Sequence, residues 1–250
     1  MGEDVYSTIM SKVALVTGAS RGIGRSIAEA LAAAGYAVVV NFASRPGDAH
    51  ATAAAITAGG GTAVALQADV SDAAAVARMF ATVDERFGRL DALVNNAGIG
   101  RRVDRLTDID DETWRRTLAV NLDGAFFCMR AAIPRLQAAG GGRIVNISSG
   151  AAHTGGAIGA HYAASKAGML ALTAKAAREL ARENIAVNAV LPSVIETEML
   201  HAVAPRRVMA QIPIGRFGRP EEVARVVRFL VAEAPGYLTG EFISVRGGRL

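Results

Sequence analysis

The feature that most limits the possible folds is a series of short apolar runs separated by longer segments of helical composition. Runs of this kind, without polar alternation, are typical of strands buried on both faces of a parallel sheet. Strand and helix alternate along the whole chain, which predicts right-handed crossovers and helices on both faces. We therefore expect an α/β fold with a single doubly wound Rossmann-type parallel sheet of about seven strands. The expected strands are 13–16, 37–40, 63–66, 92–94, 144–147, 186–191 and 242–245.

Residues at the ends of the expected helices agree with this pattern. Gly35 and Gly88 follow helical segments at the position where a left-handed residue commonly ends a helix. Ser71 precedes another helical segment and is its candidate N-cap. Pro220 stands at the start of a further segment, where proline is favoured in the first turn.

No linker, repeat or low-complexity tract divides the chain. We expect an N-terminal tail at 1–11 and one domain at 12–250. The one long irregular stretch, about 193–218, is predicted to be a substrate lid, because long loops in compact domains are usually functional.

A glycine-rich segment, "TGASRGIG" at 17–24, directly follows the first expected strand and opens a helix. Gly18, Gly22 and Gly24 allow a tight turn, close approach of the backbone to a phosphate, and close packing of helix on strand. The free N–H groups at the start of the helix then face the anion, helped by the helix dipole. In this context the segment predicts a dinucleotide site.

Tyr162 and Lys166 lie four residues apart in "HYAASKAG", so they share one face of an expected helix. Only Lys12, Lys166 and Lys175 are lysines among the 27 basic residues, so a lysine here points to a need for a compact ammonium group. Taken alone, the pair also fits a packed tyrosine with a lysine extending beside it, because such pairs are common on helices. Other motifs must decide between these interpretations.

The GxxxGxG spacing of the glycine loop resembles that of the short-chain dehydrogenase/reductase family, and the resemblance extends from Lys12 to about Gly248. It implies an oxidoreductase with a catalytic Tyr162–Lys166 pair. The other motifs in register are Asp69–Val70 after the third expected strand, "NNAG" at Asn95–Gly98, Asn121 in the next helix, Ser149 thirteen residues before Tyr162, and "PSVIET" at Pro192–Thr197.

The resemblance implies that the catalytic residues are Asn121, Ser149, Tyr162 and Lys166. Asn121 would hold a water that links Lys166 to solvent, although an asparagine in a helix can also simply bond to backbone. Ser149 would bond the substrate oxygen, and its neighbour Ser148 is the alternative. The residues expected to bind the cofactor are Gly18, Ser20, Arg21, Gly22, Ile23, Gly24, Ser44, Arg45, Asp69, Val70, Asn95, Ala97, Gly98, Tyr162, Lys166, Pro192, Ile195 and Thr197.

Tyr162 would then act as acid in carbonyl reduction and as base in alcohol oxidation, while the cofactor carries the hydride. A free phenol, with a pKa of about 10, is a poor base at neutral pH. Lowering this pKa by about three units requires about 4 kcal/mol, and a positive charge about 4 Å away supplies roughly that amount at an effective dielectric near 20. Lys166 is expected to supply this charge.

The residues after the second expected strand bear on the choice of dinucleotide. Members of the family that prefer NAD usually carry a carboxylate there, but this chain has Phe42 and no acid before Asp48. Arg21, Ser44 and Arg45 are available instead, and guanidinium groups suit a phosphate. We therefore expect NADP(H), with NAD(H) as the alternative if these arginines are only solvated charges.

"HYAASKAG" and "IPIGRFGRPEEVA" are similar to segments of 3-oxoacyl-[acyl-carrier-protein] reductases, which implies a 3-oxoacyl thioester substrate. An acidic carrier protein would require basic residues beyond the Asn121 helix and late in the Tyr162 helix. Only Arg143 and Arg182 occur there, the latter next to Glu183. Sugar, polyol, steroid or xenobiotic carbonyls remain alternatives, as does a non-catalytic dinucleotide-binding sensor on the same fold.

Composition argues against several other classes of protein. The net charge is only +4 and the arginines are spread along the chain, so no nucleic-acid binding is expected. No apolar run is long enough to span a membrane, and the single cysteine, Cys128, suits the cytoplasm. His153 and His161 flank the site without other ligands at metal spacing, so no metal is expected.

The resemblance also implies a homotetramer in which the helices of Asn121 and Tyr162 pack against partners. Ala167, Ala171 and Ala174 would allow a partner helix to approach closely, although alanines fit packing within one chain equally well. Ser193 stands where the family usually has glycine, which leaves the backbone conformation there open.

Overall fold

The computed structural model describes residues 11–203, 209–210 and 212–249. Its strands form one parallel sheet in the order β3-β2-β1-β4-β5-β6-β7, which confirms the expected α/β architecture. The expected tail at 1–11 lies almost entirely outside the described residues. The strands are β1 (Val13–Val16), β2 (Ala37–Phe42), β3 (Thr62–Gln67), β4 (Ala92–Asn95), β5 (Gly142–Ile147), β6 (Ile185–Pro192) and β7 (Phe242–Val245).

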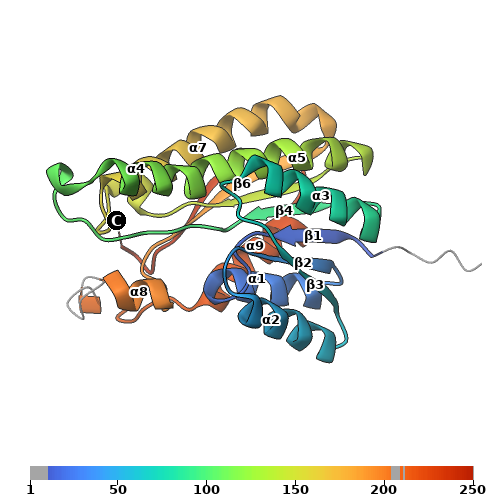
Figure 1. Ribbon diagram of the computed structural model, residues 1–250, viewed down its shortest axis with the longest axis horizontal. Coiled ribbons are helices and arrows are strands. Elements are labelled where there is room, and N and C mark those ends of the chain that lie inside the picture. The colour runs from blue at the N-terminus through green and yellow to red at the C-terminus, as the bar shows by residue number, and fades with distance from the viewer. Residues whose placement is uncertain (1–10, 204–208, 211, 250) are drawn as a thin grey trace, which may run out of the picture.

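Helices cover both faces of the sheet (Figure 1). One face packs against α1, α2 and α9, and the other against α3, α5 and α7, each with its own apolar core. The helices are α1 (Gly22–Ala33), α2 (Pro46–Ala58), α3 (Ala73–Phe87), α4 (Asp111–Leu118), α5 (Gly124–Ala138), α6 (Ala151–Thr154), α7 (Ala160–Leu180), α8 (Glu198–Val203) and α9 (Pro220–Arg228). Short 3-10 turns occur at η1 (Leu106–Asp108) and η3 (Ala181–Glu183), and π-helical turns at η2 (Ala119–Asp123) and η5 (Phe229–Glu233).

Burial along the strands explains why their sequences are almost uniformly apolar. Every residue of β1, β2, β4 and β6 is buried, because helices cover these central strands on both faces. The edge strands β3 and β7 are only partly buried. The strands in which every residue is buried therefore lie in the interior of the sheet.

The helix ends agree with the sequence at three of four positions. Gly35 and Gly88 have positive φ values of 87° and 67°, and Pro220 begins α9. The expectation of Ser71 as an N-cap is wrong, because Asp72 caps α3 by accepting a hydrogen bond from the amide of Ala74. The hydroxyl of Ser71 donates to Asp69 instead.

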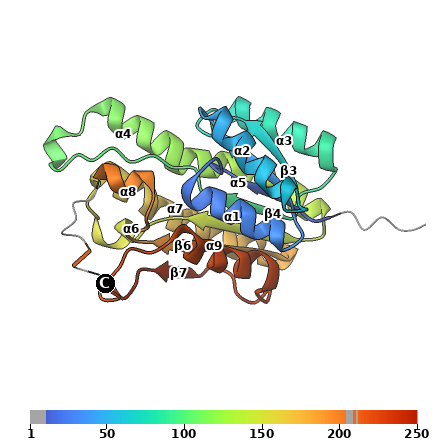
Figure 2. The ribbon, with the colours of Figure 1, turned by 90° about the horizontal axis from the view of Figure 1, so that it is seen from below.

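The chain reverses its direction of winding at β1, which lies between β2 and β4. In such sheets, ligands bind in the crevice beyond the carboxyl ends of the strands at this point. Helices α4, α6 and α8 gather at that end of the molecule (Figures 1 and 2). The stretch 193–218 is not irregular throughout: it contains α8, and Ile195 pairs with Gly218 in an isolated bridge. Residues 204–208 and 211 of it lie outside the described part.

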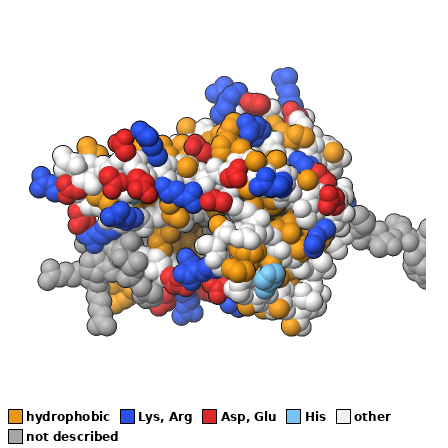
Figure 3. Space-filling model, in the orientation of Figure 1, with side chains coloured by type: hydrophobic (Ala, Val, Ile, Leu, Met, Phe, Trp, Pro, Cys, Tyr) orange, Lys and Arg blue, Asp and Glu red, His pale blue; other side chains and the backbone are white. Residues whose placement is uncertain are grey.

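Within the described part of the chain, no helix is long and apolar enough to cross a membrane. Basic and acidic side chains are interspersed over the face of the molecule seen in Figure 3, without a block of one sign. This distribution agrees with the modest net charge of +4.

Candidate functional site

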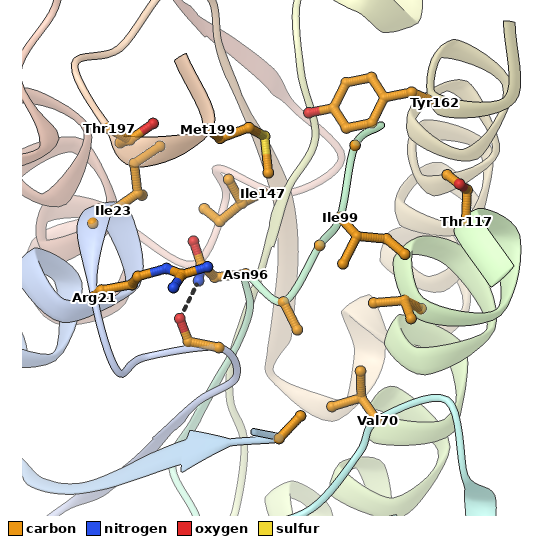
Figure 4. A pocket seen from close by; sticks show the side chains of 18 of the residues that line it. Arg21, Ile23, Val70, Asn96, Ile99, Thr117, Ile147, Tyr162, Thr197 and Met199 are labelled. Atoms are coloured by element: carbon orange, nitrogen blue, oxygen red, sulfur yellow. Dashed lines mark hydrogen bonds between the residues drawn. The ribbon is translucent and has the colours of Figure 1, made fainter. Parts of the chain in front are cut away.

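A cavity of about 930 Å³ lies at the carboxyl ends of the central strands. The glycine loop, the ends of β2, β4 and β5, the first turns of α7, and α8 all contribute to its walls. In Figure 4, the Arg21 side chain lies on one side of this cavity and the Tyr162 ring on the other, so a ligand that reaches both must be elongated.

The glycine loop forms one wall, and two of its glycines have no room for a side chain. Gly18 has φ of 60°, and a Cβ there would lie 2.9 Å from the Cα of Ala97. A Cβ on Gly24 would overlap the carbonyl oxygen of Gly18 and the side-chain amide of Asn96. The side chain of Arg21, the N-cap residue, makes no capping hydrogen bond to the first turn of α1. This wall therefore fits an anion held by backbone amides.

Three polar residues that the sequence did not single out hold this loop in place. Asn96 donates to the carbonyl oxygens of Thr17 and Gly18, at 2.9 and 3.0 Å. The Thr17 hydroxyl accepts from the amide of Asn96, and the side chain of Asn41 accepts from the amide of Gly18. A polar residue at the end of an apolar strand, as in "VVVNF", was the one available signal for Asn41.

Asp69 lies at the end of the cavity expected for the adenine. Its carboxylate accepts hydrogen bonds from the backbone and side chain of Ser71 and, at 2.9 Å, from Arg116 of α4. Burial acts to raise the pKa of Asp69, but the hydrogen bonds from Ser71 and Arg116 outweigh it and leave the pKa lowered. No pattern in the sequence predicts this contact of Arg116, because it forms only where α4 approaches the turn after β3.

At the turn after β2, Arg45 and Ser44 line the cavity together with Arg21 of the glycine loop. Both arginines contact Glu198 of α8, at 3.2 Å for Arg21 and 3.3 Å for Arg45. Phe42, at the position where an acid would repel a phosphate, is buried. Two guanidinium groups and one carboxylate therefore meet at this end of the cavity.

Tyr162 and Lys166 are both buried in the first part of α7, and both line the cavity. The Lys166 Nζ atom lies 5.8 Å from the centre of the Tyr162 ring and donates to the carbonyl oxygen of Ile147 at 2.8 Å. The phenol oxygen of Tyr162 points into the cavity, toward the side on which Thr197 and Met199 lie (Figure 4). The two side chains thus face the same crevice, as the sequence pattern predicts.

Burial dominates the proton affinity of both groups. It raises the pKa of Tyr162 above 10.0, while the Ser149 hydroxyl acts in the opposite direction. It lowers the pKa of Lys166 from 10.5 to about 8. From the sequence we expected the lysine charge to lower the pKa of the phenol, but the exclusion of water around Tyr162 has the larger effect and raises this pKa.

The two neighbouring serines have different partners. The Ser148 hydroxyl donates to the backbone oxygen of Lys166 at 2.8 Å, which ties the end of β5 to α7. Ser149 lines the cavity and accepts a hydrogen bond from the amide of Ala151 at 3.1 Å. The Ser149 hydroxyl also hydrogen-bonds to Tyr162, so Ser149 is the serine that lies beside the phenol in the cavity.

Asn121 is fully buried in the π-helical turn η2, behind the cavity wall. Its side chain accepts from the amide of Ile99 at 2.8 Å, and donates to the Ile99 carbonyl and to Ser165, both at 3.0 Å. These hydrogen bonds of Asn121 join it to the backbone of Ile99 and to Ser165, so they stabilise the fold around the cavity. A Cβ on Gly98 would lie 3.4 Å from both the Asn121 side-chain oxygen and the Lys166 nitrogen. The water relay stays a prediction.

Of the residues expected to bind the cofactor, Asn95 alone does not line the cavity. Its side chain donates to Asn146 of β5 at 2.8 Å, and Asn146 donates in turn to Thr173 of α7 at 2.8 Å. The side chains along β4 alternate in direction, so Asn96 reaches the cavity instead. The others line it: Gly18, Ser20, Arg21, Gly22, Ile23, Gly24, Ser44, Arg45, Asp69, Val70, Ala97, Gly98, Tyr162, Lys166, Pro192, Ile195 and Thr197.

Ser193 also lines the cavity, and its backbone is not strained. Among the described residues other than glycine, only Asn184 has a positive φ. The described residues contain no group of three side chains that could hold a metal ion. His153 is exposed outside the cavity, and His161 is buried with Nε2 3.0 Å from the carbonyl oxygen of Arg101.

The shape and lining of the cavity fit a dinucleotide. The glycine wall can receive a pyrophosphate, the Asp69–Val70 end an adenine, and the Tyr162 end a nicotinamide next to Ile195 and Thr197. Comparison with known proteins agrees with this geometry. The model of the family described as short chain dehydrogenase matches residues 12–207.

Curated relatives cover nearly the full length. The chain is 43% identical over 243 residues to a 3-oxoacyl-[acyl-carrier-protein] reductase of Synechocystis sp., covering 97% of this chain and 98% of that protein. It is 44% identical over 242 residues to the enzyme of that name in Staphylococcus aureus, covering 96% and 98%. An uncharacterized oxidoreductase of Methylorubrum extorquens is 41% identical over 248 residues, covering 97% and 99%. These matches confirm the resemblance: the chain belongs to the short-chain dehydrogenase family and is an oxidoreductase.

Proposed function

We propose that the protein is an NADP(H)-dependent carbonyl reductase that interconverts a ketone and a secondary alcohol, with a 3-oxoacyl thioester as its substrate. The observation that carries this proposal is the convergence of Tyr162, Lys166 and Ser149 on the cavity that the glycine loop also lines. A protein that only sensed the dinucleotide would not need an acid, a cation and a hydroxyl donor at the same end of the cavity.

The cofactor supplies the hydride when bound. The Tyr162 phenol gives its proton to the substrate oxygen, and because burial raises its pKa it is protonated and ready to act as an acid at neutral pH. The Ser149 hydroxyl donates to the same oxygen as negative charge develops there. Lys166 stabilises the phenolate that remains, and Asn121 holds the path by which the proton is replaced.

The case for NADP(H) rests on Arg21, Ser44 and Arg45. These residues line the end of the cavity where we place the adenosine ribose. The chain has Phe42 at the position where members that prefer NAD carry a carboxylate. Guanidinium groups bind a phosphate monoester more strongly than they bind a hydroxyl.

The case for a 3-oxoacyl thioester rests on the names of the Synechocystis and Staphylococcus relatives and on the lining of the cavity near Tyr162. Ile99, Ile158, Met199 and Leu200 provide an apolar wall that suits an acyl chain. An acyl-carrier protein would present that chain as a thioester.

We also propose that the protein works in the cytoplasm as a homotetramer. Trp114 of α4 and Phe126 of α5 are large apolar side chains exposed on neighbouring elements, and Ala171 and Ala174 leave room on α7. Sedimentation at several protein concentrations tests the assembly, and a monomer at micromolar concentration would contradict it.

The test of the reaction uses the loss of NADPH absorbance with a 3-oxoacyl thioester, alongside sugar, polyol and steroid ketones. We expect turnover of the thioester, and we expect Tyr162→Phe to abolish it while nucleotide affinity measured by fluorescence stays within about two-fold. Equal turnover by this variant would refute the acid role. Binding of NADPH without turnover of any ketone would indicate a sensor instead.

A further inference from the structure

Glu198, the first residue of α8, joins two parts of the cofactor site that are distant in sequence. Its carboxylate lies 3.2 Å from Arg21 of the glycine loop and 3.3 Å from Arg45 of the turn after β2. All three residues line the same cavity. One carboxylate therefore receives both of the guanidinium groups that the proposed function assigns to a phosphate.

Carboxylates and phosphate monoesters both accept hydrogen bonds from the N–H groups at the edge of a guanidinium group, so they compete for it. The side chains of Arg21, Arg45 and Glu198 are 45%, 48% and 60% exposed. Ion pairs as exposed as these are weak and exchange readily with other anions. A phosphate at this position would also be repelled by the Glu198 charge if that carboxylate stayed in place.

We propose that Glu198 reduces the preference for NADP(H), because its carboxylate competes with the 2′-phosphate for Arg21 and Arg45. The contact weakens binding of the phosphorylated dinucleotide and leaves the unphosphorylated one unaffected. The enzyme thus binds NADP(H) less tightly than its two arginines alone would allow. This inference rests on the proposed binding of the 2′-phosphate by these arginines.

The test measures binding by calorimetry with adenosine 2′,5′-bisphosphate and with 5′-AMP, which differ only in the 2′-phosphate. We expect Glu198→Gln to bind the bisphosphate about five-fold more tightly than wild type, with 5′-AMP unchanged. Glu233→Gln is the matched control. Glu233 is 51% exposed and pairs with Arg228 at 3.0 Å, so this variant removes the same charge from a similar ion pair elsewhere.

Three outcomes would overturn the proposal: bisphosphate affinity that is unchanged or weaker in Glu198→Gln, an equal gain for 5′-AMP, or an equal gain in Glu233→Gln. The variant Arg45→Ala separates this failure from that of the proposed function. If Arg45→Ala removes the preference for the bisphosphate while Glu198→Gln leaves it unchanged, only the role of Glu198 fails. If Arg45→Ala also leaves the preference unchanged, the phosphate assignment fails as well.

Discussion

Replacing Lys166 with methionine should stabilise the protein at neutral pH, even though the proposed mechanism uses this lysine. Burial lowers the pKa of Lys166 from 10.5 to about 8. At about 1.4 kcal/mol per pKa unit, keeping this group charged costs the folded state roughly 3 kcal/mol. Lys166→Met removes this cost with little change in side-chain length. It also removes a donor from the Ile147 carbonyl, a loss of about 1.5 kcal/mol, so the net gain near neutral pH is about 2 kcal/mol.

The dependence on pH tests the cause of this gain. Folded Lys166 loses its proton at about pH 8 and the unfolded chain at 10.5, so the unfolded state binds more protons between these values. Wild-type stability therefore rises with pH across this window, and the cost falls to about 2 kcal/mol by about pH 9. The advantage of Lys166→Met should shrink by about 1 kcal/mol between about pH 7 and about pH 9.

Urea unfolding of both proteins at the two pH values, at fixed protein concentration, measures these differences. Lys175→Met is the control on the same helix, because Lys175 is exposed and pairs with Glu179 at 2.9 Å. Its stability should stay within about 0.5 kcal/mol of wild type at both pH values. If Lys166→Met is less stable than wild type near pH 7, or if its advantage does not shrink toward pH 9, the desolvation argument is refuted.

Three further predictions concern the cavity and the core. Gly24→Ala should weaken NADPH binding about ten-fold or more, because its Cβ would overlap Gly18 and Asn96; titration with NADPH checks this, and unchanged affinity would contradict it. Ser149→Ala should lower kcat about 10²-fold in steady-state assays with little change in nucleotide affinity; an unchanged kcat would remove Ser149 from the mechanism. Burial raises the pKa of the Cys128 thiol to about 12, so a thiol reagent should label it only after unfolding in urea; rapid labelling of the native protein would show that the site opens.

The strands and the glycine loop could be predicted from the sequence because both depend on local patterns. A buried parallel strand needs a continuous apolar run, and a phosphate-binding turn needs glycine where a Cβ would collide with its neighbours. Side-chain contacts between segments distant in the sequence could not be predicted in this way. Arg116 binds Asp69 only because α4 approaches the turn after β3, and no spacing in the sequence encodes that distance.

Choices between adjacent residues were also difficult from sequence. Ser71 and Asp72 are both good N-caps, and only the path of the backbone into α3 selects the aspartate. Asn95 and Asn96 differ only in which side of the chain they project from at the end of β4. The pKa of Tyr162 could not be predicted from its spacing to Lys166, because the effect of burial depends on how much water the surrounding elements exclude.

The chain of polar contacts from Asn95 through Asn146 to Thr173 has a consequence for the precision of catalysis. A helix lined with alanine and glycine has a smooth surface, and sliding it by one residue shifts it about 1.5 Å and turns each side chain about 100°. Two hydrogen bonds fix the position of α7 along β5: one from Asn146 to Thr173, and one from Ser148 to the Lys166 carbonyl. Losing them would leave a folded protein in which the direction of the Tyr162 phenol relative to β5 is no longer fixed.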